Sequence, residues 1–261
     1  MAAGIPLEKA KEHLENLNSL LLEQKTIDPF TARKIRDELS SSETELTNVA
    51  LSYLDALTGK MSSALSYLRL SLDVNDVNLA YHYHHILINT FNYQELREAS
   101  YDLARKYQSK LFSYNAYSWA YRYGERDELD FFINEHIKLL SEDEGRSAAM
   151  KHKEELLSEM DEFFKVSKCS KEQLRILADS IWSLMGEYKA TSGFVHLSGK
   201  GGGCYVVDIK NLDPKTIARM NFDLADRICA DTRMDDCTLL ARFSAPRTLH
   251  TGVSYHAGQR N

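Results

Sequence analysis

Residues that interrupt helices are almost absent from the central part of this chain. No proline lies between Pro29 and Pro214. Between residues 5 and 185 the glycines are Gly59, Gly124 and Gly145. Because proline and glycine are the residues that most reliably end a helix, this stretch is predicted to be almost entirely helical.

Short turn signals divide the helical stretch at a regular interval. They lie at residues 58–60, 91–93 and 124–125, which gives one period of 33 residues and a second of 32. A period in this range is typical of stacked helix hairpins. Hairpins are therefore predicted over residues 43–74, 78–107 and 111–140, and arrays of this kind usually present a binding surface.

The first of these repeats carries three residues at a distinctive spacing. Gly59 in the turn is followed by the small residue Ala64 five positions later and by the aliphatic Leu72 eight positions after that. In this respect residues 43–140 resemble the tetratricopeptide repeat family. The resemblance implies a right-handed superhelix whose concave face, built from the first helix of each pair, holds a peptide or protein partner.

The other two repeats match this pattern less completely. In the third, Gly124 and Ile137 occupy the expected places, but Leu129 stands at the small position. In the second, Asn92 replaces the glycine and Ala99 is displaced by two positions. The proline that usually closes each repeat is absent. The spacing of residues in the three repeats therefore predicts an architecture of stacked helix hairpins.

Composition and charge argue against several classes of protein. The chain has 261 residues, of which 43% are hydrophobic and 27% charged, as in soluble globular proteins. A net charge of −6 argues against a general binder of nucleic acid or of anionic membranes, because both depend on clustered Lys and Arg. No apolar run approaches the roughly 20 residues of a membrane span, and the N-terminus lacks the apolar core of a secretory signal. The chain is therefore expected to be cytoplasmic.

The C-terminal third has a different pattern. Six of the twelve glycines lie between residues 186 and 203, and apolar residues alternate in what we predict as strands at 193–198 and 204–210. One helix is predicted before these two strands in the sequence and one after them, followed by a third strand at 237–243. The order α-β-β-α-β predicts a small antiparallel α+β module with its helices on one face. The expected domains are a helical repeat domain over 1–166, the α+β module over 167–245 and a flexible tail over 246–261.

Two clusters in the repeats are candidates for partner binding: a stripe of three tyrosines at i, i+3 and i+7 on one helix, and two histidines with an asparagine one turn later on another. Tyrosine combines a large apolar area with a polar tip, which suits a recognition surface. Helix packing is the alternative role of these rings, and zinc binding is an alternative role of the two histidines at i, i+3, for which no acidic or cysteine ligand lies nearby in sequence. The predicted partner-binding residues are His82, His85, Asn89, Tyr114, Tyr117 and Tyr121.

The loop between the first two strands is a candidate anion-binding site. Its backbone N–H groups would surround an anion, and its lysine would supply the opposite charge. The loop leads into a strand instead of a helix, however, so a plain hairpin tip is the favoured interpretation. The residues concerned are Gly199, Lys200, Gly201, Gly202 and Gly203.

The sequence as a whole favours a non-enzymatic adaptor or regulatory protein that binds a protein or peptide in an aromatic-lined groove of the repeats. Self-association through the C-terminal module is a further expectation. One rival is a hydrolase-like or nuclease-like effector using His196, Lys200 and Cys204. The other is a local nucleic-acid binder using Lys200, Lys210, Arg242 and the tail from Arg247 to Arg260. Neither a metal nor a cofactor is predicted, since the four cysteines match no zinc spacing.

Overall fold

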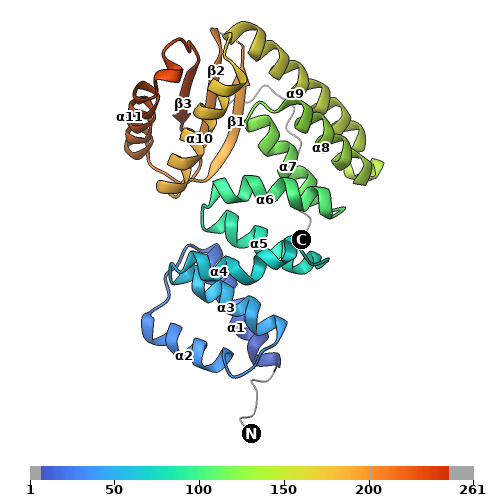
Figure 1. Ribbon diagram of the computed structural model, residues 1–261, viewed down its shortest axis with the longest axis vertical. Coiled ribbons are helices and arrows are strands. Elements are labelled where there is room, and N and C mark those ends of the chain that lie inside the picture. The colour runs from blue at the N-terminus through green and yellow to red at the C-terminus, as the bar shows by residue number, and fades with distance from the viewer. Residues whose placement is uncertain (1–6, 200–201, 247–261) are drawn as a thin grey trace. The chain divides into compact units, whose positions relative to one another are not determined.

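A computed structural model describes residues 7–199 and 202–246 of the protein (Figure 1). It divides into two compact units, unit 1 (Met1–Asn92) and unit 2 (Tyr93–Asn261). The boundary falls between the two helices of the predicted second hairpin. None of the helices in the described ranges combines the length and the apolar character that a membrane span requires.

Unit 1 is helical throughout its described part. Asp28 caps its second helix, because the Asp28 side chain accepts a hydrogen bond of 2.9 Å from the Phe30 backbone N–H and Pro29 occupies the first helical turn. The elements are α1 (Leu7–Leu22), α2 (Pro29–Leu39), α3 (Glu45–Leu57), α4 (Met61–Leu68), the short 3-10 helix η1 (Arg69–Leu72) and α5 (Val77–Asn89).

A small apolar core and a buried polar network hold unit 1 together. Ala10, Leu39 and Ala50 bring α1, α2 and α3 into contact. Nearby, the buried Asp55 carboxylate on α3 accepts a hydrogen bond from Arg36 of α2 and one of 2.5 Å from the Ser63 hydroxyl of α4. Because a buried carboxylate is stable only when its oxygens are satisfied, this network fixes the three helices relative to one another.

Three helices end on a residue with left-handed backbone at the predicted interval. Gly59, Phe91 and Gly124 have φ angles of 76°, 58° and 66° and follow one another by 32 and 33 residues. The expectation that Asn92 takes the glycine position of the second repeat is therefore wrong, since Phe91 holds it. A bulky side chain in this conformation costs on the order of 1 kcal/mol, which neighbouring structure must offset.

Unit 2 joins helices to a small sheet. Its order confirms the predicted fold class, which is mainly helical with an α-β-β-α-β end. The elements are α6 (Tyr93–Lys106), α7 (Lys110–Arg122), α8 (Arg126–Leu139), η2 (Glu142–Glu144), α9 (Arg146–Ser167), α10 (Lys171–Glu187), β1 (Ser192–Ser198), β2 (Cys204–Ile209), α11 (Pro214–Ala230), η4 (Thr232–Met234) and β3 (Leu240–Ser244).

The sheet has the order β1-β2-β3 and is mixed, not antiparallel as expected. β1 and β2 pair antiparallel, with Val195 opposite Val207, whereas β2 and β3 pair parallel, with Val207 opposite Phe243. The reason is α11, which carries the chain back along the sheet so that β3 runs in the direction of β2 (Figure 1). β2 is buried on both faces, so its burial does not follow the alternation from which the strand was predicted.

Helices and sheet of unit 2 share one interior. The backbone N–H of Leu197 on β1 donates to the Tyr121 hydroxyl on α7 at 3.1 Å. The Tyr205 hydroxyl on β2 donates to the Arg122 carbonyl at 2.9 Å. The boundary expected near residue 166 lies within this unit, in the last turn of α9. Of the expected tail, residues 247–261 lie outside the described residues.

Candidate functional site

α7 keeps one side accessible although its other sides are buried. It packs against α6 and α8, and its buried residues include Phe112, Ala116 and Trp119. The accessible residues recur at three- and four-residue spacing, so they form one helical stripe. This stripe, called the α7 face below, consists of Leu111, Tyr114, Asn115, Ser118 and Arg122.

The predicted tyrosine stripe lies mostly beside this face. Tyr117 and Tyr121 retain 3% and 6% of their surface, so they offer little area to a partner while unit 2 keeps this conformation. The Tyr121 hydroxyl also donates to Glu159 at 3.3 Å, and burial, followed by the charge of Glu159, raises the pKa of Tyr121. Tyr114 is partly exposed, and its ring packs against that of Tyr117 with centroids 5.2 Å apart.

At the C-terminal end of the α7 face, the guanidinium of Arg122 lies against both tryptophans of the chain. Its Cζ atom is 4.5 Å from the ring centroid of Trp119 and 4.6 Å from that of Trp182 on α10. The two rings meet edge to face, 4.7 Å apart. Each cation–π contact contributes about 0.5–2 kcal/mol, so the rings hold the cation in place.

Among the described residues, no hydrogen-bond acceptor accompanies this cation. Burial lowers the pKa of Arg122, and the next largest influences, which act in the opposite direction, come from tyrosines. Within the described residues, Arg122 forms no ion pair with a carboxylate. The Nε1 atom of the neighbouring Trp119 is buried and also has no hydrogen-bond partner there. Trp182 differs, because its Nε1–H donates to the Tyr205 hydroxyl at 3.1 Å. The site therefore has hydrogen-bond donors in excess.

Several other arginines of unit 2 pair with a carboxylate. Arg97 pairs with Glu125, and Arg105 and Arg126 pair with Glu128 and Asp161. Burial lowers the pKa of Arg97, but the charge of Glu125 outweighs it, so that pKa is raised overall. The guanidinium of Arg122 lies deeper than that of Arg97, because the tryptophan rings against it are buried, and it lacks such a carboxylate among the described residues.

The residues predicted on α5 lie together in unit 1. The Tyr53 hydroxyl and the His82 Nδ1 atom are 3.0 Å apart, and the ring of Tyr53 stacks on that of His85. Asn89 donates to the His85 carbonyl at 2.8 Å. Burial is the main cause that lowers the pKa of both histidines, so both rings are neutral at pH 7. This cluster and the α7 face belong to different units.

The glycine loop is described only in part, since Lys200 and Gly201 lie outside the described residues. Gly202 has open space at its Cα, but Gly203 packs closely on Ser167 of α9. His196 and Cys204, which the hydrolase alternative would use together, are not directly opposed across the strands, because His196 lies opposite Val206 and Cys204 opposite Ser198. Of the residues in the nucleic-acid alternative, Lys210 and Arg242 are exposed.

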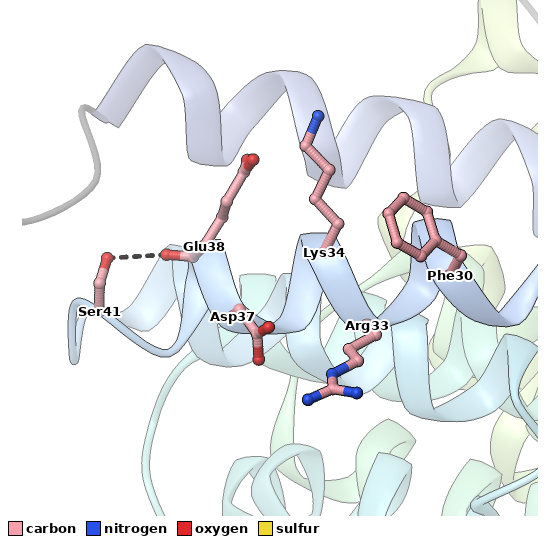
Figure 2. Close-up of a pocket in the computed structure, with 6 residues that line it drawn as sticks. All are labelled: Phe30, Arg33, Lys34, Asp37, Glu38 and Ser41. Carbon is pink, nitrogen blue, oxygen red and sulfur yellow. Dashed lines mark hydrogen bonds between the residues drawn. The ribbon is translucent and has the colours of Figure 1, made fainter.

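A surface hollow of about 520 Å³ lies on α2 of unit 1 (Figure 2). Its side chains diverge in Figure 2, where Lys34 and Glu38 point to one side of the helix and Arg33 to the other. Glu38 already binds Lys9 at 2.7 Å and His13 at 2.9 Å on α1. Since binding sites need convergent polar groups, this hollow is a weaker candidate than the α7 face. The lining residues are Phe30, Arg33, Lys34, Asp37, Glu38 and Ser41.

In the part of the chain that the structure describes, no three His, Cys, Asp or Glu side chains gather in a way that would hold a metal ion. Comparisons of the chain with protein-family models, with curated proteins and with solved structures give no match.

Arg122 is the residue of this site that the sequence pattern missed. The tyrosine pattern indicated a stripe at positions 114, 117 and 121. The accessible stripe of α7 is instead rotated by one residue toward positions 115, 118 and 122. A signal was present: Arg122 lies three residues after Trp119, one of only two tryptophans in the chain. That Trp182 joins them from α10 follows only from the tertiary structure.

Proposed function

We propose that this protein binds a protein or peptide partner and that the α7 face of unit 2 is its contact surface. The observation that carries the proposal is the guanidinium of Arg122, which two tryptophans hold and which has no carboxylate beside it in the part of the chain that the structure describes. Arginine, tryptophan and tyrosine are the residues that most often dominate the binding energy of protein interfaces. A guanidinium that is already fixed loses little entropy when a partner binds.

The composition of the face also suits a protein partner. Leu111, with 40% of its surface exposed, offers apolar area at one end, and Arg122 offers charge at the other. Tyr114, Asn115 and Ser118 between them are polar but neutral. An adaptor or regulatory role in the cytoplasm is the form of this function that the sequence predicts. The α5 cluster of His82, His85 and Asn89 is a second proposed contact, on unit 1.

Capture of the partner from the native host tests this proposal with two matched variants. Ser118→Arg places a long charged side chain in the middle of the α7 face. Phe222→Arg makes a comparable change on α11, where Phe222 has 73% of its surface exposed and lies outside the face. We expect quantitative mass spectrometry to show one partner, retained at the wild-type level by Phe222→Arg and reduced at least about tenfold by Ser118→Arg. Equal capture by all three proteins would contradict the proposal.

A further inference from the structure

The chemistry of the Arg122 site narrows the class of partner. We infer that Arg122 binds a glutamate side chain of the partner, so that the partner segment lying on the α7 face is acidic. This inference rests on the proposed function and adds to it the chemical group that is recognised.

The first step is the excess of donors. A guanidinium carries five N–H groups, and within the described residues none of those of Arg122 has an acceptor. The tryptophan rings attract its charge, but their faces do not replace the acceptor that a hydrogen bond needs. The Tyr205 hydroxyl is already used, because it accepts from Trp182 and donates to the Arg122 carbonyl. The missing group is therefore an acceptor with negative charge.

The second step is the number of charges. Nucleic acids and membrane surfaces are bound by clusters of cations, each of which neutralises one phosphate. The other members of the α7 face, namely Leu111, Tyr114, Asn115 and Ser118, carry no charge, and the chain has a net charge of −6. A single guanidinium among neutral side chains matches a single carboxylate, whose two oxygens fit the planar fork of arginine.

The third step is the depth at which the guanidinium of Arg122 lies below the surface. Arg122 is partly buried and enclosed by Trp119 and Trp182, so a ligand group must reach inward to meet it. A glutamate carboxylate lies three bonds beyond its own backbone, whereas a chain-terminal carboxylate lies on the backbone itself. The longer reach favours a glutamate side chain from a segment that lies along α7.

The test uses the position of the two tryptophans. Trp119 and Trp182 are the only tryptophans in the chain and both contact Arg122, so their fluorescence reports binding at this site directly. The probe is a short peptide of alternating glutamate and alanine, acetylated and amidated so that only side chains are charged. We expect a saturable fluorescence change in the full-length protein, weakened by added salt. Arg122→Gln should reduce the affinity at least about tenfold, and Arg122→Lys by less, since lysine keeps the charge but loses the fork.

The controls separate the possible ligands. The same peptide with glutamine in place of glutamate is expected to cause no saturable change, as are an alanine peptide with a free C-terminus and inorganic phosphate. The inference is overturned if the glutamate peptide gives no saturable fluorescence change at millimolar concentration. It is also overturned if a control ligand binds with the same affinity as the glutamate peptide, or if Arg122→Gln binds that peptide with the affinity of the wild type.

A second variant keeps the test valid if Arg122→Gln does not fold. Ser118→Glu places a carboxylate one helical turn before Arg122, where it competes for the guanidinium. It is expected to abolish the peptide response in a folded protein, and an undiminished response would contradict the inference. If the peptides fail to bind while Ser118→Arg still loses the captured partner, the proposed function stands and only the acidic class of partner is wrong.

Discussion

Replacing Gly203 with alanine is expected to lower the free energy of unfolding of unit 2 by about 3 kcal/mol, from backbone strain and steric overlap together. Gly203 has a φ of 104°, a backbone conformation that residues other than glycine rarely adopt. A Cβ atom there would lie 2.5 Å from the Ser167 Cβ and 3.1 Å from the Ser167 Cα. Because the second neighbour is backbone, relief requires that α9 and β2 move apart.

Gly202 provides a matched control for this prediction. Its φ of 96° is similar, but a Cβ atom built on it meets nothing within 4 Å. Gly202→Ala should therefore show the backbone strain alone, and Gly203→Ala a larger loss. Ser167→Gly in the Gly203→Ala background is expected to recover part of the difference. Urea unfolding followed by fluorescence measures all four proteins, because both tryptophans lie in unit 2; equal losses for the two glycine variants would refute the predicted overlap.

Acid is expected to destabilise unit 2 through His136 on α8. This residue is fully buried, and the Ser113 hydroxyl lies 3.0 Å from its Nδ1 atom. Burial lowers the pKa of His136 from about 6.5 to about 4 in the folded state. The unfolded chain therefore takes up a proton as the pH falls below 6.5, while the folded unit stays neutral until about pH 4. The contribution of the neutral, buried His136 to the free energy of unfolding is fully present above pH 6.5. It is lost as the pH falls toward 4, and the loss amounts to up to about 3 kcal/mol.

The matched variants for this prediction are His136→Gln and His152→Gln. Burial also lowers the pKa of His152, but this residue on α9 is partly exposed, so its contribution should be smaller. The free energy of unfolding, measured in urea between pH 7 and pH 5, should fall with pH in the wild type. It should fall much less in His136→Gln and almost as steeply as wild type in His152→Gln. A slope unchanged by His136→Gln would show that this histidine is not the group that titrates.

The sequence predicts elements better than it predicts how they associate. The absence of proline and glycine located the helices, and the alternation at 204–209 located β2, because both signals act within one element. The left-handed residue of the second repeat was misplaced by one position, since glycine preference cannot identify a phenylalanine in that role. The parallel pairing of β3 was missed for a different reason: it depends on where α11 returns the chain.

The candidate site shows the same difference. Periodicity grouped Tyr114, Tyr117 and Tyr121 on one stripe but did not indicate that β1 and α9 cover Tyr121. The enclosure of Arg122 depends on Trp182, which is 60 residues away in sequence. In the sequence alone, Arg122 looks like an ordinary basic residue in the last turn of a helix. The lack of an acceptor becomes evident only when the surroundings of its guanidinium are known.

Site-specific photo-cross-linking in the native host tests most directly whether the α7 face is a contact surface. A benzophenone amino acid replaces Asn115 at the centre of the face, and a second protein carries it in place of Phe222 on α11. We predict that position 115 cross-links to one discrete protein, that position 222 does not, and that Arg122→Gln removes the product at 115. No product at 115, or the same product at both positions, would contradict the account.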